Sequence, residues 1–187
     1  MPTKTRTYNL AGMDLVVNRI LTGATKPSQG NFAFSTGNGS ISDRVNVVNH
    51  TTGATRSILL SESGTIFILN KADGIVFTMP DISADTLGVY YDFVVNTSVT
   101  SNAYKWSTFT QGTEFFDGSL NSLQDAAVAS TVFTGDGTTH DNISMNGTTT
   151  GGLIGTKFRA ICYTATKWTV LGDVRGSGTE ATPFSTT

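Results

Sequence analysis

Few side chains in this sequence could be tuned for acid–base, nucleophilic or metal chemistry. The chain has two histidines, His50 and His140, and a single cysteine, Cys162. Neither histidine has a second histidine three or four residues away, and Cys162 has no companion at a metal-ligand spacing. We expect both histidines in solvated loops and Cys162, within the apolar run 158–163, as a small buried hydrophobe. The sequence therefore predicts that the protein is not an enzyme and needs no metal or cofactor.

Two groups of oxygen-bearing side chains have the composition needed for glycoside hydrolysis or for Ca²⁺ binding. Glu114 and Asp117 flank an aromatic pair, and glycosidases use two carboxylates whose spacing is spatial rather than sequential. We expect ordinary surface or strand-end carboxylates at these positions. The loop 135–142 offers oxygen ligands suited to Ca²⁺, but it lacks helix–loop–helix spacing and a closing glutamate, so a bare turn is expected. Whether this loop binds an ion or a glycan stays open at this point.

Three aromatic residues could form a platform on which sugar rings stack. Tyr90, Tyr104 and Trp106 have the flat apolar faces that such a platform needs. Because they lie in alternating β-favouring runs, we expect them in the core or in strand pairs instead.

Composition excludes several classes of partner. Formal net charge is −2 and only 14% of residues are charged, so we expect no nucleic-acid groove, which needs clustered Lys and Arg. We also expect no membrane partner, because the sequence has neither a polybasic stretch nor an apolar run near the ~20 residues of a span. The first residues lack the apolar stretch of a signal peptide, so synthesis in a cytosol is expected.

From Ile41 onward the pattern indicates an all-β fold. Short β-favouring runs are divided by turn residues at the spacing typical of sandwiches and barrels, and 156–163 with 167–172 forms the clearest hairpin. No repeat of ~20–50 residues stands out, so a solenoid is not expected. We predict an antiparallel β-sandwich or barrel, jelly-roll-like, over 41–175. Six residues are predicted in its core: Leu69, Phe77, Phe93, Val95, Phe158 and Trp168.

An extended N-terminal arm, residues 1–40, is predicted ahead of this domain, and a flexible C-terminal tail, 176–187, after it. The arm has too many apolar residues to leave in water, while its Gly- and Pro-containing breaks prevent a separate core. The alternative, that these residues are a disordered leader or the first strands of the domain, stays open. Six arm residues are predicted to bind a partner chain: Leu10, Met13, Val17, Ile20, Phe32 and Phe34.

Four segments together resemble a recurrent phage module. A strand with Ser, Gly and Phe (59–70) leads through an Ala/Gly turn to a strand that ends in proline (74–80). A Tyr/Phe-rich strand (88–95) follows, and the closing hairpin ends on Lys-Trp-Thr-Val-Leu-Gly (167–172). Over roughly 58–173 the chain is similar to bacteriophage capsid decoration, or cement, proteins and to some fibre-tip domains.

The resemblance implies a virion structural protein without catalytic activity. Proteins of this kind bind the outer surface of a capsid, often as homotrimers, and their partner is the major capsid protein. The alternative is a phage fibre or spike domain that binds host glycans, although a long repetitive shaft is not visible here. Head or tail location, the symmetry position on a shell and the identity of the coat partner are left undecided by the sequence.

Overall fold

The computed structural model describes residues 31–34, 41–44, 46–123 and 130–187. Its packing divides the chain into two units, Met1–Arg44 and Val45–Thr187, which are described separately. In the first unit, β1 (Asn31–Phe34) pairs antiparallel with β2 (Ile41–Arg44) as a two-stranded sheet. Because β2 pairs with β1, the boundary falls at Arg44, four residues after the predicted end of the arm.

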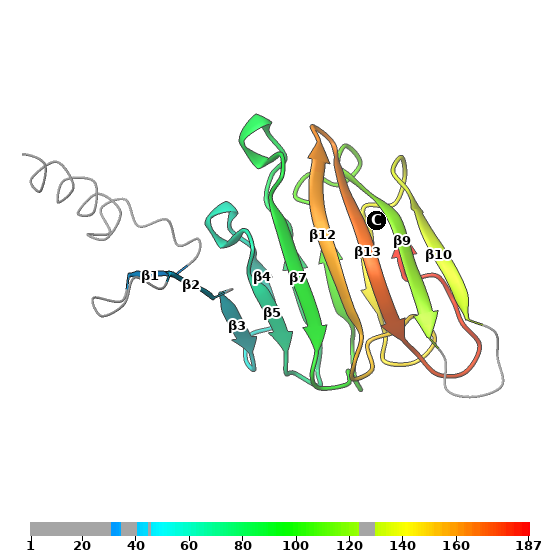
Figure 1. Cartoon of the computed structure of the whole chain (residues 1–187). Coiled ribbons are helices and arrows are strands. Elements are labelled where there is room, and N and C mark those ends of the chain that lie inside the picture. Colours follow the sequence, from blue (N-terminus) through cyan, green and yellow to red (C-terminus); the bar gives the residue numbers. More distant parts are fainter. Residues whose placement is uncertain (1–30, 35–40, 45, 124–129) are drawn as a thin grey trace, which may run out of the picture. The chain divides into compact units, whose positions relative to one another are not determined.

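The second unit is a β-sandwich of a seven-stranded and a five-stranded sheet (Figure 1). The larger sheet has the order β10 (Thr131–Asp136), β9 (Phe115–Leu123), β13 (Lys167–Arg175), β12 (Lys157–Thr164), β7 (Tyr90–Val95), β5 (Ile66–Leu69) and β3 (Val47–His50). The smaller has the order β14 (Phe184–Ser185), β11 (Asn142–Met145), β8 (Tyr104–Ser107), β6 (Ile75–Thr78) and β4 (Thr55–Ser57). Two short 3₁₀ turns, η1 (Leu60–Glu62) and η2 (Ala84–Thr86), connect strands. No helix among the described residues is long and apolar enough to cross a membrane.

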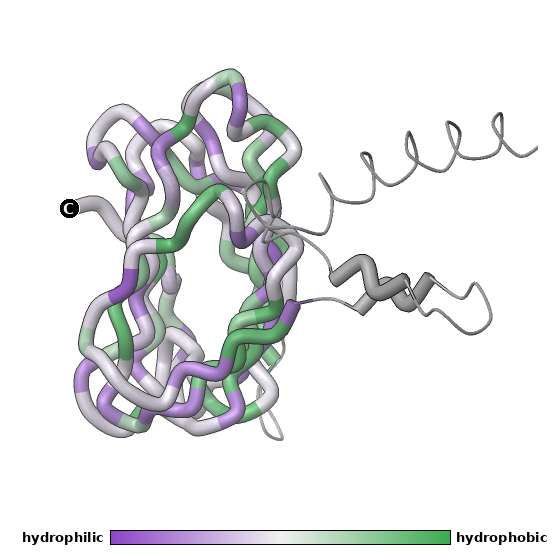
Figure 2. Tube along the Cα trace, turned by 90° about the vertical axis from the view of Figure 1, so that its left-hand side faces the viewer, coloured by the Kyte–Doolittle hydropathy of each residue, from purple (hydrophilic) through white to green (hydrophobic). Residues whose placement is uncertain are grey.

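The predicted all-β sandwich is confirmed, and its sheets are mixed rather than purely antiparallel. From β3 to β8 the strands alternate between the two sheets, and neighbours within each sheet are parallel. These strands therefore wind as three coils, each with one strand in either sheet. Figure 2 looks on to the β3 end and shows the backbone running round between the two walls. The winding was not expected, because turns of unequal length hide the repeat in the sequence.

The coils are stacked in register by like residues. Phe67 on β5 lies on Phe93 of β7, with ring centroids 5.3 Å apart and planes 17° apart. At the strand ends, the amide of Asn96 donates to Asn70, and that of Asn70 donates to Asn49, each over 2.6 Å. Such asparagine ladders form where identical side chains repeat at the strand spacing, so they fix the register of the coils.

The space between the sheets is filled by one apolar cluster. All six predicted core residues are buried in it, which confirms the strand registers assigned to them. The predicted hairpin is also confirmed, with β12 and β13 antiparallel and Cys162 opposite Trp168. Cys162 is buried, as expected of a small hydrophobe, and burial raises the pKa of its thiol to about 11.

The C-terminal residues return to the sandwich instead of forming a tail. β14 pairs antiparallel with β11, and the Phe184 side chain is buried in the core cluster. The hydroxyl of Thr187 donates to Asp141 (2.8 Å). Burial of Phe184, the pairing of β14 with β11 and the bond from Thr187 to Asp141 together offset the entropy of ordering this polar segment.

Candidate functional site

Most predicted arm residues lie outside the described part of the chain. This holds for Leu10, Met13, Val17 and Ile20. Phe32 and Phe34 belong to β1, whose backbone pairs Phe32 with Asp43 and Phe34 with Ile41. The partner-binding role of the six residues stays a prediction.

His50 is not in a solvated loop. It ends β3 and is 8% exposed, with its ring stacked on Phe67 (centroids 5.7 Å) and edge-on to Phe77 (5.4 Å). Burial, followed by the charge of Arg56, lowers the pKa of His50, so the neutral imidazole is favoured. The parallel winding brings these three rings together. The residues next to His50 in the sequence carry no pattern that predicts this contact.

The loop 135–142 is a self-contained turn. The carboxylate of Asp136 accepts from the backbone N–H groups of Thr138, Thr139 and His140 at 2.9–3.1 Å, and from the Thr139 hydroxyl. These bonds, the Thr139 hydroxyl first, hold the pKa of Asp136 well below its usual range. Asp141 accepts from the backbone N–H of Gly112 (3.1 Å). The carboxylates of Asp136 and Asp141, which could have met a Ca²⁺, are thus engaged in hydrogen bonds within the protein.

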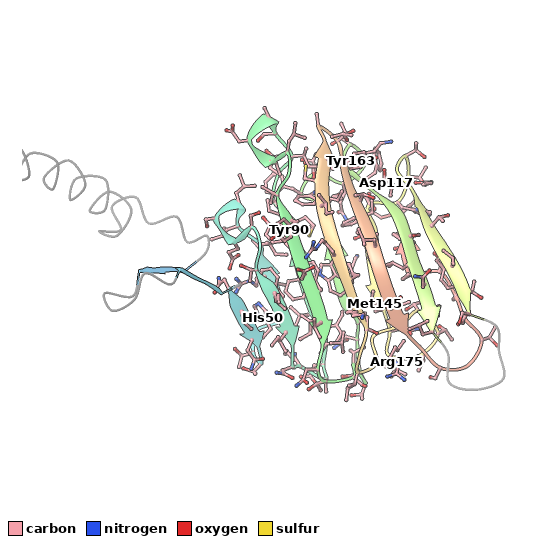
Figure 3. The ribbon with its side chains drawn as sticks, viewed as in Figure 1. His50, Tyr90, Asp117, Met145, Tyr163 and Arg175 are labelled. Atoms are coloured by element: carbon pink, nitrogen blue, oxygen red, sulfur yellow. The ribbon has the colours of Figure 1, made fainter. Side chains whose placement is uncertain are left out.

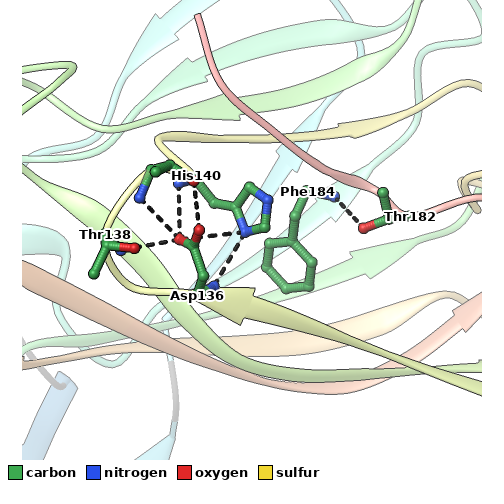
Figure 4. A network of polar contacts seen from close by, with 6 residues as sticks. Asp136, Thr138, His140, Thr182 and Phe184 are labelled. Atoms are coloured by element: carbon green, nitrogen blue, oxygen red, sulfur yellow. Dashed lines mark hydrogen bonds and ion pairs between the residues drawn. The ribbon is translucent and has the colours of Figure 1, made fainter.

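His140 joins this turn to the last strand. Its Nδ1 accepts from the backbone N–H of Asp136 (3.1 Å), and its ring stacks on Phe184 with centroids 5.7 Å apart (Figure 4). His140 therefore lies in a loop, as expected, with a side chain that is partly exposed (24%) and not fully solvated. In the described part of the chain, no group of three or more His, Cys, Asp or Glu side chains is arranged to hold a metal ion.

The carboxylates flanking the aromatic pair have separate structural roles. Glu114 is buried and accepts from the backbone N–H groups of Ile82 (2.9 Å), Phe109 (3.0 Å) and Thr110 (3.2 Å). It directly precedes β9, so it is a strand-end carboxylate as one of the two expectations had it, but it is not at the surface. Asp117 lies on the outer side of β9 and accepts from the hydroxyl of Tyr163.

The outer face of the seven-stranded sheet carries a row of polar and charged side chains across its centre. Arg159 on β12 donates two hydrogen bonds to Asp92 on β7, from Nε to Oδ1 (2.7 Å) and from Nη2 to Oδ2 (2.8 Å). Its guanidinium lies over the ring of Tyr90, 4.6 Å from the centroid. The two hydrogen bonds hold the guanidinium in one orientation, and Asp92 raises the pKa of Arg159. In Figure 3, Tyr90, Tyr163 and Asp117 lie over this front sheet.

A groove of about 370 Å³ runs beside the ion pair. Its walls combine aliphatic side chains with the charges of Asp92 on β7 and of Lys157 and Arg159 on β12, and the Lys157 ammonium lies 3.8 Å from the carboxylate of Asp173. Gly172 lets the backbones of β13 and β12 approach closely beside the groove, because a Cβ at this position would come within 2.4 Å of the carbonyl oxygen of Lys157. The lining residues are Ile66, Asp92, Phe93, Val94, Lys157, Phe158, Arg159, Leu171 and Gly172.

The sugar-stacking platform is not assembled. Tyr104 and Trp106 are fully buried, as the alternation predicted, and the single hydrogen of the Tyr104 hydroxyl is within bonding distance of the carbonyl oxygens of Lys71 (2.8 Å) and Thr97 (2.9 Å). Tyr90 lies on the outer face, where the guanidinium of Arg159 covers one side of its ring.

Sequence reasoning missed the outer face because it followed only the inward residues. The available signal was apolar residues at both parities of a strand. Ile66 and Phe67 on β5, and Phe93 and Val94 on β7, are neighbours that point to opposite faces. A strand that is apolar on both faces needs a partner on each side.

Comparison with known proteins gives no family for this chain, since no family model, curated protein or solved structure matches it. Its function is therefore inferred from the site.

Proposed function

We propose that this chain is a virion structural protein that binds the outer surface of a phage capsid and stabilises contacts between coat subunits. The observation that carries this proposal is the outer face of the seven-stranded sheet. There Ile66, Val94 and Leu171 surround the rigid pair of Arg159 and Asp92 beside a groove. An apolar patch with a preoriented arginine at its centre is the composition typical of protein interfaces.

The polar rim of this face fits the same role. Ser119 and Asn121 on β9 and Thr134 on β10 continue the row toward the edge of the sheet. Neutral hydroxyls and amides make hydrogen bonds to a protein partner without the desolvation cost of charges. The major capsid protein is the proposed partner, and the mature location is the capsid surface after synthesis in the host cytoplasm.

The arm adds to the affinity in this proposal. Residues 1–40, with Leu10, Met13, Val17 and Ile20, provide apolar groups that an extended segment can place in grooves of a coat subunit. Many copies on one shell then gain from multivalency. The glycan-binding alternative is not carried forward, because two of its three platform residues are in the core.

The test is co-sedimentation of the full chain with purified, DNA-free heads of the phage that encodes it. Leu171→Glu places a charge in the centre of the apolar patch and is expected to weaken binding at least about tenfold. Leu87→Glu is the matched control, since Leu87 and Leu171 are both 51% exposed and Leu87 lies in the connection after η2, outside the groove and its polar rim. Equal binding by both variants, or no binding by the wild type, contradicts the proposal.

A further inference from the structure

The first coil of the sandwich directs two ionisable side chains toward the core. This coil consists of β3 in the larger sheet and β4 in the smaller sheet. His50 on β3 lies opposite the core residue Leu69, and Arg56 on β4 lies opposite the core residue Phe77. Because paired residues of neighbouring strands share a face, both side chains lie on the inner side of their sheets. Figure 3 labels His50 at β3.

Both side chains pack on the ring of Phe67. The imidazole of His50 is stacked on this ring at 5.7 Å between centroids, and the guanidinium carbon of Arg56 lies 5.3 Å from the same centroid. His50 is 8% exposed, and its Nε2 atom is buried with no hydrogen-bond partner among the described residues. The imidazole is therefore enclosed by aromatic rings and shares one of them with a cation.

The charges around His50 balance only while its imidazole is neutral. In the described part of the chain, the charged groups that act on it are the Arg56 cation on β4 and the Glu62 carboxylate of η1. These two groups form an ion pair with each other. From β5 and β6, His50 is contacted by aromatic rings that carry no charge. A second cation at this place would have no carboxylate of its own.

A proton on His50 is therefore costly while the first coil is closed. The imidazolium ion is a donor at both nitrogens, so Nε2 would become a charged N–H group without an acceptor. The new charge would also repel Arg56 where little water screens it. In an open coil the same imidazole is in water and titrates at its ordinary pKa of about 6.5. Burial and the charge of Arg56 accordingly lower the pKa of His50 in the closed coil.

We propose that His50 is an acid-sensitive lock on the first coil, so that β3 and β4 open more often as the pH falls below about 6.5. In this window the open coil binds one proton more than the closed coil, so the free energy of opening falls as the pH falls. Opening turns the residues between Arg44 and η1 into a longer connection and leaves one edge of β5 and one of β6 unpaired. The lock goes beyond the proposed function, and it is measured without shells.

The first test is hydrogen exchange of the full chain at pH 7.5 and 5.5, read by NMR as protection factors. The N–H groups of Ile66 and Asn70 donate to the carbonyls of residues 46 and 50 and report on the first coil. Their protection is expected to fall about three- to tenfold, tenfold being the limit for one group that titrates at 6.5 when open. The N–H of Val95, bonded beside β12, reports on the centre of the sheet and should not lose protection. Unchanged protection of Ile66 and Asn70, or an equal fall at Val95, overturns the lock.

Two variants assign the effect to one histidine. His50→Phe keeps a flat ring among the same neighbours and cannot titrate, so the first coil should keep its protection at pH 5.5. His140→Asn is the matched control, because it removes the only other histidine and retains a side-chain acceptor for the N–H of Asp136. It should show the loss seen in the wild type. The same pH dependence in His50→Phe as in the wild type contradicts the proposal.

A titration of the wild-type ring decides the question even where His50→Phe folds poorly. The carbon-bound ring protons of the two histidines are followed by NMR, and the His140→Asn spectrum identifies the signals of His50. Their midpoint is expected below pH 6.5, because the closed coil disfavours the imidazolium. A midpoint at or above 6.5 shows that the closed coil tolerates the proton and overturns the lock.

Discussion

Arg159 and Asp92 lie opposite each other on β12 and β7 and are joined by two parallel hydrogen bonds of 2.7 and 2.8 Å. Both side chains are partly exposed, so their coupling in a double-mutant cycle is expected to stay below about 1 kcal/mol. The pair matters more for orientation than for stability. Arg159→Lys keeps the charge but cannot make the two parallel hydrogen bonds of the guanidinium. It should therefore leave the free energy of unfolding in urea nearly unchanged and weaken binding to heads. A coupling energy above about 2 kcal/mol contradicts this division of roles.

The asparagine ladder should contribute measurably to the stability of the coils. Asn70→Ala removes the bond to Asn49, the bond from Asn96 and a bond from the Thr97 hydroxyl (3.2 Å). The expected loss is about 1–3 kcal/mol in the free energy of unfolding, measured in urea. Asn121→Ala, which removes one surface bond to Asp173 (3.3 Å), is the control and should cost less than about 1 kcal/mol. Equal losses for the two variants count against a structural ladder.

Glu114 should make stability depend on pH. Burial raises its pKa above the ordinary 4.5, against the lowering effect of bonds from Ile82, Thr110 and Phe109. The folded state therefore binds more protons than the unfolded state just above pH 4.5, and the free energy of unfolding falls as pH rises through that window. Glu114→Gln does not titrate, so the wild type should lose stability relative to the variant from about pH 4.5 upward. A difference that is constant with pH, or of opposite slope, contradicts the raised pKa.

The core prediction is tested by two phenylalanines of opposite burial. Phe93→Ala opens a cavity at the centre of the aromatic stack and should cost about 3–5 kcal/mol in chemical denaturation. Phe109 is 58% exposed, and its replacement by alanine should stay within about 0.5 kcal/mol of the wild type. Similar costs at both sites exclude the sheet packing described above.

Local alternation was sufficient to predict much of the fold. Phe77, Phe93 and Trp168 were placed in the core from strand periodicity alone, because a period of two fixes which side of a sheet a residue faces. The β12–β13 hairpin was equally accessible, since its partners are joined by a short turn. The parallel coils were not, because their partners are joined by long connections of unequal length.

The contacts of the candidate site were even less predictable from the sequence than the order of the strands. Glu114 meets Ile82, His50 meets Phe77, and Arg159 meets Asp92, all across large separations in the sequence. None of these pairs has a motif of its own. A single sequence reveals which face of a strand is apolar, while the neighbours across that face follow only from strand order.

The coil winding also bears on the order in which the chain folds. Val47 on β3 pairs with Ile66 on β5, whereas Phe115 on β9 pairs with Lys167 on β13. The second pairing therefore closes a much longer loop of chain. Each doubling of loop length adds about 0.6 kcal/mol to the entropy of closure. During synthesis the three coils can be complete before β13 leaves the ribosome, and the C-terminal half of the larger sheet closes last. Until then one edge of β9 stays unpaired, which makes this interval the one in which a nascent chain is most exposed to aggregation.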